Sequence, residues 1–362
     1  MSTLQVNTIE NRSGERFDLG GGNKNLLING GMNIWQRQIT AAVSGGYKTA
    51  DRWQTDFSSL GGFTQSRSTD VPSGQGFSYS LKMDCTSADT SPAASDKLII
   101  IQRIEGQNLQ HLQKSTSSAK KMTLSFWVKS NKTGTYVVKF ETTGGRFISK
   151  TYTINSSSTW EKKTITVEGD TGGSAIANDY TEGLSVQWWL GAGANYTLGL
   201  NGSWDVVTEN LSASGQVNLA DSTSNEWYMT GCQLEVGSQA TNFEFEPFET
   251  VLRKCERYYE HSFHEGQFEG AVTTSHCWHT NSFSSSDDNC PGPFFRVVKR
   301  DTPVVRLYSS SLNVAGQISS GGTPRTATAA NITTRYVSYI SVVSGTGLTY
   351  CRYNYAAESE LS

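Results

Sequence analysis

Charged residues are scarce in this 362-residue chain. Asp, Glu, Lys and Arg make up 17% of it, whereas an average globular protein has about a quarter. The formal net charge is only −3. So small a net charge steers the chain neither to phosphate backbones nor to anionic lipid. We therefore expect no nucleic-acid partner.

Long apolar runs are also absent. A run such as Leu98–Ile101 is far too short to cross a bilayer, because a membrane-spanning helix needs about 20 apolar residues. The opening residues, MSTLQVNT, provide neither a basic segment nor an apolar core. We therefore expect no membrane insertion and no signal peptide.

The cysteines lack the CxxC spacing of metal and redox sites. Singly placed cysteines on apolar strand faces are usually reduced core residues, so we expect no disulfide and no cofactor. His276, Cys277, His279 and Cys290 form one metal-like cluster, but consecutive positions alternate across a strand and would separate the ligands. We therefore predict a surface loop with one buried cysteine there. The six cysteines are Cys85, Cys232, Cys255, Cys277, Cys290 and Cys351.

What the chain does contain is Ser, Thr, Asn and Gly in nearly every segment, together with 9 Trp, 15 Tyr and 15 Phe. Aromatic and β-branched side chains suit half-buried strands, and Gly and Asn suit the turns between them. Several segments alternate apolar and polar residues with period two, including 122–129, 135–140, 184–190 and 228–236. No helical segments alternate with them, which favours a sandwich over βαβ units.

These patterns predict an all-β chain with four parts. Residues 1–24 would be a separate N-terminal strand, in which Leu4 and Val6 alternate with polar neighbours. Residues 25–248 would form a β-sandwich. A short linker helix would occupy residues 249–260, where Val251, Leu252 and Cys255 recur at helical spacing. Residues 261–362 would form a C-terminal β-sandwich, with strands near 294–298, 302–308, 336–343 and 348–355.

The leader, residues 1–24, cannot bury a core by itself, so we expect it to pair with another copy or another protein. Three copies could complete one another around an axis, which predicts a homotrimer.

Six segments of the chain look familiar: Val6–Glu10, Asn25–Arg37, Tyr47–Trp53, Leu124–Ser130, Gln233–Glu244 and Cys255–Tyr259. Together they resemble a family of tail-fibre and receptor-binding virion proteins of tailed bacteriophages, most strongly over residues 1–260 and more weakly over 261–362. Two stretches, 124–130 and 233–244, look like carbohydrate-binding jelly rolls of those proteins. The resemblance implies that residues 1–24 are an N-terminal attachment strand and that residues 25–248 form a jelly-roll-like β-sandwich.

The resemblance implies a trimeric virion component that contacts other tail or baseplate proteins through residues 1–24 and a host-surface glycan or protein elsewhere. Such a protein folds in the host cytoplasm and leaves by lysis, which would reconcile its low-charge surface with the missing export signal. The family has no shared active-site motif. Capsid decoration (a head fibre), a capsule depolymerase and a secreted carbohydrate-binding module are the alternatives.

Enzyme signatures are missing from the sequence. His264-Glu265 lacks the second histidine of a zinc-protease helix, and Gly172–Ile176 breaks the nucleophile-elbow pattern at its last position. A depolymerase would need two converging carboxylates, and sequence alone places no such pair. We expect binding without catalysis.

Trp127 and Trp189 each stand on the polar side of a strand whose other side is apolar. Sugar rings stack on exposed aromatic rings while neighbouring polar groups bind their hydroxyls. The two tryptophans are therefore candidates for a sugar-binding platform, unless a loop or another subunit covers them. Trp53, Trp160, Trp188 and Trp227 are expected in the core or an interface.

A second candidate lies near the C-terminus, in a predicted loop at 275–293. It combines ring and amide side chains that can stack on and hydrogen-bond a glycan, and loops at sandwich ends tolerate such variation. Its candidate ligand-binding residues are His276, Trp278, His279, Asn281, Asp287, Asp288 and Asn289.

Overall fold

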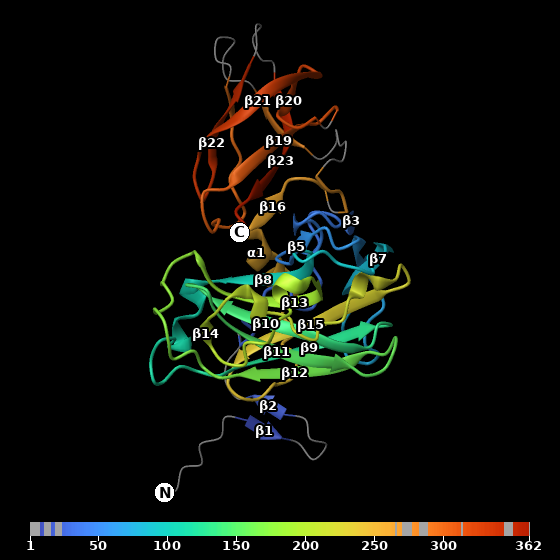
Figure 1. Ribbon diagram of the computed structural model, residues 1–362. Coiled ribbons are helices and arrows are strands. Elements are labelled where there is room, and N and C mark those ends of the chain that lie inside the picture. Colours follow the sequence, from blue (N-terminus) through green and yellow to red (C-terminus); the bar gives the residue numbers. More distant parts are fainter. Residues whose placement is uncertain are drawn as a thin grey trace, which may run out of the picture. The chain divides into compact units, whose positions relative to one another are not determined.

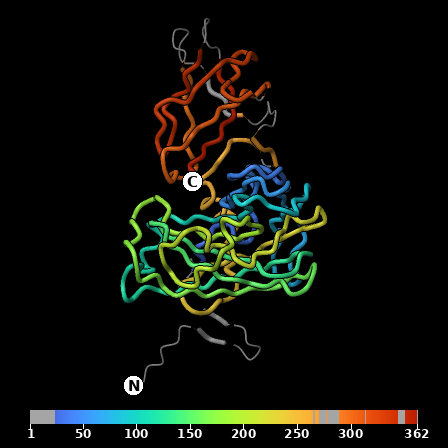
Figure 2. Tube along the Cα trace, viewed as in Figure 1, coloured from blue at the N-terminus to red at the C-terminus, as the bar shows by residue number. Residues whose placement is uncertain are grey.

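The computed structural model describes residues 24–264, 266–269, 277–281, 289–312, 314–343 and 350–361, together with two short strands before them. The chain divides into two compact units. The first comprises Met1–Asn33 and Ile39–Pro247, and the second Ile34–Gln38 and Phe248–Ser362. Figure 2 shows the chain path of each unit by sequence colour.

Two antiparallel sheets make up most of the first unit (Figure 1). The seven-stranded sheet has the order β14 (Asp205–Val206), β11 (Arg146–Ile154), β10 (Gly134–Thr142), β13 (Glu182–Ala192), β8 (Lys97–Glu105), β5 (Gln54–Ser58) and β4 (Gly46–Tyr47). The six-stranded sheet has the order β12 (Glu161–Val167), β9 (Met122–Ser130), β15 (Glu226–Val236), β7 (Ser80–Ser87), β6 (Gly62–Ser68) and β3 (Thr40–Ala42). This all-β sandwich of jelly-roll type confirms the predicted fold class.

The core lies between these two sheets. Phe126 from β9 meets Trp188 from β13 edge to face, with ring centroids 5.8 Å apart, and Trp53 packs on Trp188 at 5.4 Å. Trp53, Trp188 and Trp227 are fully buried, as expected, whereas Trp160 is only half-buried. Short 3-10 turns connect the strands: η1 (Gly106–Asn108), η2 (Gln110–Leu112), η3 (Ala194–Tyr196), η4 (Glu209–Leu211) and η5 (Leu219–Asp221).

Alternation predicts the facing of most strands correctly, but β15 is an exception. Its pairing with β9 shifts register between Thr230 and Gln233. Before this irregularity the odd-numbered residues of β15 face the core, and after it the even-numbered residues do. Trp227 and Met229 therefore share the core side with Cys232 and Leu234, and Tyr228 turns outward, not to the core as the simple period-two pattern predicts.

The leader contains a hairpin of β1 (Thr8–Glu10) and β2 (Arg16–Asp18), paired antiparallel from Thr8–Asp18 to Glu10–Arg16. The expectation that the leader has no partner within its own chain is therefore wrong for this part. The sequence pattern misses the pairing because each strand has only three residues. Leu4 and Val6 lie outside the described residues.

The described residues of the second unit form α1 (Phe248–Glu256) and eight strands. The helix ends four residues before the predicted boundary at 260, because the chain from Tyr259 onward pairs with the last strand. The strands are β16 (Tyr259–His261), β17 (Trp278–Asn281), β18 (Asn289–Pro291), β19 (Val304–Ser309), β20 (Gln317–Ser320), β21 (Thr323–Ile332), β22 (Val337–Val342) and β23 (Tyr350–Glu358).

Strand β21 pairs with two neighbouring strands. Its first four residues pair with β20, and the following residues pair with β22. Buried side chains from β19 to β23 form the core of the unit, with Ile318, Ile340 and Tyr353 at 0% exposure. The predicted strand at 294–298 is reduced to one bridge between Phe294 and Tyr336. The backbone N–H of Arg296 instead donates to the Glu260 carboxylate, which takes it out of any ladder.

Cys290 in β18 and Cys351 in β23 form a disulfide across 61 residues of sequence. The expectation that every cysteine stays reduced is wrong for this pair. Both residues are buried in the core of the second unit, and a separation so long leaves no local pattern in the sequence. Cys85, Cys232, Cys255 and Cys277 are not in disulfides.

The segment Ile34–Gln38 belongs to the second unit although it lies early in the chain. The Arg37 guanidinium lies 3.9 Å from the centre of the Tyr259 ring and forms ion pairs of 3.2 Å with Glu358 and Glu360. Gln36 donates a hydrogen bond to the carbonyl of Tyr259. The chain therefore passes between the two units three times.

No helix among the described residues is long and apolar enough to cross a membrane.

Candidate functional site

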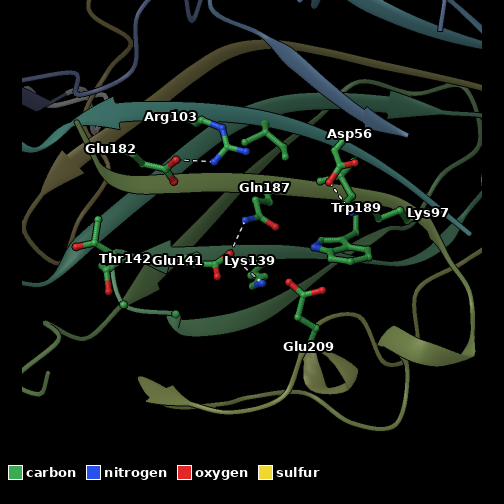
Figure 3. A pocket seen from close by; sticks show the side chains of 15 residues that line it. Asp56, Lys97, Arg103, Lys139, Glu141, Thr142, Glu182, Gln187, Trp189 and Glu209 are labelled. Carbon is green, nitrogen blue, oxygen red and sulfur yellow. Dashed lines mark hydrogen bonds and ion pairs between the residues drawn. The ribbon is translucent and has the colours of Figure 1, made fainter. Parts of the chain in front are cut away.

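A groove of about 360 Å³ opens on the face of the seven-stranded sheet that points away from the core (Figure 3). This volume lies at the lower end of the roughly 300–1,000 Å³ range of ligand pockets. The groove is lined by Asp56, Lys97, Ile99, Ile101, Arg103, Lys139, Glu141, Thr142, Thr143, Gly144, Gly145, Glu182, Gln187, Trp189 and Glu209.

Strand register explains how these side chains come together. Trp189 in β13 lies opposite Ile99 in β8 on one side and Val137 in β10 on the other. Two residues along, Gln187 lies opposite Ile101 and Lys139. Alternate residues of a strand point to one face, so these positions share the face opposite the core.

Trp189 forms the apolar floor of the groove. Its ring packs with Tyr196 of η3 at a centroid distance of 5.3 Å, and Ile99, Ile101 and Val137 surround it. The residue is only 2% exposed, and its indole nitrogen is buried without a hydrogen-bond acceptor. Trp188 and Trp227 share that lack but do not line the groove. A buried donor without an acceptor costs about 1–3 kcal/mol.

Three ion pairs form the polar part of the groove. Lys97 contacts Asp56 at 2.6 Å, Arg103 contacts Glu182 at 2.6 Å, and Lys139 contacts Glu141 at 2.9 Å (Figure 3). The side-chain amide of Gln187 donates to Glu141 at 2.8 Å, and Arg103 also donates to Gln54 at 2.9 Å. These contacts fix the rotamers of the long side chains before any ligand arrives.

The charge state of Lys97 follows from its neighbours. Burial by itself would lower the pKa of Lys97, but the hydrogen bond from its ammonium to Asp56 and the charges of Asp56 and Glu209 raise that pKa above the usual value. Lys97 is therefore a cation at neutral pH.

The two predicted tryptophans do not form one platform. Trp127 lies in β9 of the six-stranded sheet, half-buried and opposite Lys162 and Thr230, whereas Trp189 lies in the other sheet. The polar sides of β9 and β13 face away from each other because each strand turns its apolar side into the shared core. Of the two, Trp189 lines the groove.

The C-terminal candidates are only partly described. Trp278, His279 and Asn281 lie in β17, which pairs with β23, and Asn289 begins β18. The stretch predicted as a loop therefore contains two strands. The side chains of β17, and all of His276, Asp287 and Asp288, lie outside the described residues. Within the described residues, no group of three or more His, Cys, Asp or Glu side chains could hold a metal ion.

Sequence reasoning missed the charged residues of the groove. The signal was present, because Lys97, Ile99, Ile101 and Arg103 occupy alternate positions, as do Lys139 and Glu141. In β8 this alternation is hard to see, because the four consecutive apolar residues Leu98–Ile101 make both faces of the strand apolar at its centre.

No protein-family model matches the sequence, and no curated protein matches it. Among solved structures, an enzymatically active domain of tailspike protein 4 from bacteriophage CBA120 aligns at 12% identity and TM-score 0.32, over 59% of this chain and 21% of that one. A family 11 carbohydrate-binding module from Clostridium thermocellum, in complex with a β-1,3-1,4-mixed-linked tetrasaccharide, aligns at 7% identity and TM-score 0.28, over 56% and 97%.

The N-terminal cellulose-binding domain of a β-1,4-glucanase from Cellulomonas fimi aligns at 9% identity and TM-score 0.27, over 52% of this chain and 90% of that one. TM-scores this low assign no function to this chain. Its fold is established by its own sheet topology.

Proposed function

We propose that the first unit binds a glycan in the groove of the seven-stranded sheet. The observation that carries this proposal is the composition of the groove: fixed amide, carboxylate and ammonium groups line it, above a floor whose indole and two isoleucines are each 2% exposed. Such polar groups exchange hydrogen bonds with sugar hydroxyls, and the floor offers only the edges of its apolar side chains to the C–H groups of a sugar ring.

We further propose that this binding involves no catalysis. Hydrolysis of a glycosidic bond usually requires a protonated carboxyl group and a second carboxylate at a set separation. Here Asp56, Glu141 and Glu182 each neutralise a cation within 2.9 Å. Glu209 is the remaining carboxylate of the groove, so its described lining offers no second carboxylate outside an ion pair.

The wider role that we propose is attachment of a tailed bacteriophage to its host, with the chain as a tail fibre of the virion. This proposal rests on the sequence resemblance of residues 1–260. Labelling of phage particles with an antibody against the chain tests it. Signal at the tail tip or fibres supports the role, and signal on the head would instead favour a capsid decoration protein.

We propose a homotrimer for the assembled protein. The β1–β2 hairpin has three residues in each strand, and isolated two-stranded hairpins are marginal in water. Association with other copies would give the leader the additional contacts it needs. Light scattering on the purified full chain should report three subunits, and a stable monomer would refute this part of the proposal.

Glycan binding is tested with an array of defined oligosaccharides probed with the full chain. Thr143, an exposed residue in the β10–β11 turn, lines the groove, so Thr143→Trp should obstruct it without disturbing the core. We expect binding to weaken at least about tenfold, which corresponds to ~1.4 kcal/mol. Thr164→Trp is the matched control, because Thr164 is exposed on β12 of the other sheet.

Two outcomes would contradict the proposal. One is an array on which no oligosaccharide binds the unmodified chain. The other is binding that Thr143→Trp leaves intact. If Thr164→Trp or Trp127→Ala abolished binding instead, the site would lie on the six-stranded sheet. Release of reducing ends from a bound polysaccharide would contradict the absence of catalysis.

A further inference from the structure

The groove contains seven ionisable side chains whose charges do not balance. Four are carboxylates and three are cations, so the formal net charge of the groove is −1. The carboxylates are Asp56, Glu141, Glu182 and Glu209, and the cations are Lys97, Arg103 and Lys139.

Every cation of the groove is already paired. Lys97, Arg103 and Lys139 each contact a different carboxylate, at 2.6, 2.6 and 2.9 Å respectively. Lys139 is also 2% exposed, with its ammonium 4.2 Å from the centre of the Phe147 ring, so it cannot easily turn toward a ligand. An acidic sugar would therefore have to break an existing pair, leaving a carboxylate without its partner.

Glu209 is the carboxylate in excess. It lies in η4 and is exposed, and its side chain accepts no hydrogen bond from any described residue. Figure 3 shows Glu209 among the labelled residues that line the groove. A sugar bound there would therefore present its substituents to a carboxylate that is in no ion pair, although its charge acts on Lys97.

We propose that the groove selects against acidic sugars and that Glu209 favours a sugar carrying an amino group. This inference rests on the proposed function of the groove, because it names the class of glycan that the same site takes. Neutral sugars bind through the floor and the fixed polar groups, and an ammonium group adds an attraction to Glu209. A uronate or sialate meets a repulsion of similar size.

The expected effect is modest because Glu209 is exposed to solvent. Exposed ion pairs are typically weak, which corresponds to about a two- to fivefold change in affinity. The preference should also fall as salt is added, since the Debye length is about 3 Å in 1 M salt.

The experiment uses the full chain and two matched series of oligosaccharides: glucose, glucosamine and glucuronate tetramers with β-1,4 links, and the corresponding galactose, galactosamine and galacturonate tetramers. They are included in the glycan array and measured again by calorimetry, at a mildly acidic pH at which the sugar amines are protonated. We expect the order amino, neutral, acidic within any series that binds.

Glu209→Gln should abolish the preference for the amino sugar over the neutral one, so that the two affinities become about equal. Glu168→Gln is the matched control, because Glu168 is 71% exposed and lies outside the groove. Failure of the inference can be distinguished from failure of the proposed function. If no sugar of any series and no other glycan on the array binds, the proposed function fails.

If sugars bind but the acidic series binds best, glycan binding stands and the inference is overturned. The same holds if the preference for amino sugars persists at full size in Glu209→Gln.

Discussion

The indole nitrogen of Trp53 donates a hydrogen bond of 3.1 Å to the backbone carbonyl of Asn29. In return, the side-chain amide of Asn29 donates to the carbonyl of Asp51 at 3.0 Å. Asn29 adopts a left-handed backbone with φ 58°, which asparagine tolerates better than most residues. Asn29 and the pair Asp51 and Trp53, which the sequence presents in separate segments, are therefore held together by two hydrogen bonds within the first unit.

Gly30, the residue after Asn29, should be irreplaceable. A Cβ at Gly30 would lie 2.0 Å from the carbonyl oxygen of Cys232, and the Gly30 carbonyl accepts a hydrogen bond from the Cys232 N–H. We predict that Gly30→Ala destabilises the fold by about 1–3 kcal/mol or more, because the clash is with backbone. Gly31→Ala is the control, since its Cβ would meet nothing closer than 3.4 Å. Equal denaturation midpoints for the two variants would contradict the prediction.

Lys299 and Glu260 form an ion pair of 2.6 Å in which both side chains are 0% exposed. Glu260 also accepts hydrogen bonds from the Tyr355 hydroxyl at 2.8 Å and the Arg296 N–H at 3.1 Å. Burial lowers the pKa of Lys299, and the charge of Glu260 opposes that shift. Glu260→Gln keeps an acceptor but leaves the ammonium without its counter-charge, so we predict a loss of about 3–5 kcal/mol.

The double variant Glu260→Gln, Lys299→Met removes both charges and keeps the acceptor. We expect it to be more stable than Glu260→Gln alone, because no charge is then left buried without a partner. Urea denaturation of the wild type, both single variants and the double variant gives the coupling energy. Strict additivity of the two substitutions would show that the pair is not coupled.

His261 makes the second unit sensitive to acid. Burial, followed by the charge of Arg296, lowers the pKa of His261 to about 4, whereas a histidine in the unfolded chain titrates near 6.5. Its Nδ1 accepts a hydrogen bond from the Phe263 N–H at 3.1 Å, which a proton there would abolish. The unfolded chain binds a proton between these two pKa values and the folded chain does not. Stability is therefore lost as pH falls from about 6.5 toward 4.

The wild type should therefore lose more stability than His261→Gln when the pH is lowered from 7.5 to 5. We predict a difference of about 2 kcal/mol between the two losses. The measurement is the difference between denaturation free energies at those two pH values. His111→Gln, at an exposed histidine, should leave that difference unchanged. If His261→Gln retained the full pH dependence of the wild type, carboxylates rather than His261 would be responsible.

The Cys290–Cys351 bond predicts the thiol count of the oxidised protein. Under denaturing conditions without reductant, four thiols should react and two should not. Closing a loop over 61 residues stabilises the fold by about 4 kcal/mol in the chain-entropy model. Reductant should therefore lower the denaturation midpoint of the wild type and leave that of Cys290→Ala, Cys351→Ala unchanged. Six reactive thiols would contradict the pairing.

The sequence predicts the strands better than their boundaries. Period-two alternation locates β9, β10 and β13 within two residues at each end, because each has one face in the core. It fails where another interaction overrides the pattern. The β15 irregularity reverses the facing of Tyr228, and the hydrogen bond from Arg296 to Glu260 replaces a strand at 294–298.

The candidate site is harder to predict than the strands. Trp189 can be identified from the sequence because it interrupts a polar face. Its neighbours Lys139 and Arg103 come from strands distant in sequence, and only the pairing register brings them to the same face. A sequence pattern states which residues share a face of one strand, and the order of strands in the sheet decides which strands lie side by side.

The early segment Ile34–Gln38 has a mechanical consequence. Because the chain passes between the units after Asn33, after Gln38 and after Pro247, a force that pulls one unit from the other is shared by three peptide connections. Drawing Ile34–Gln38 out of the second unit would also break both ion pairs of Arg37 and expose Trp35. Unfolding of the second unit from its helix onward would therefore also have to release an anchor that comes from the opposite end of the sequence.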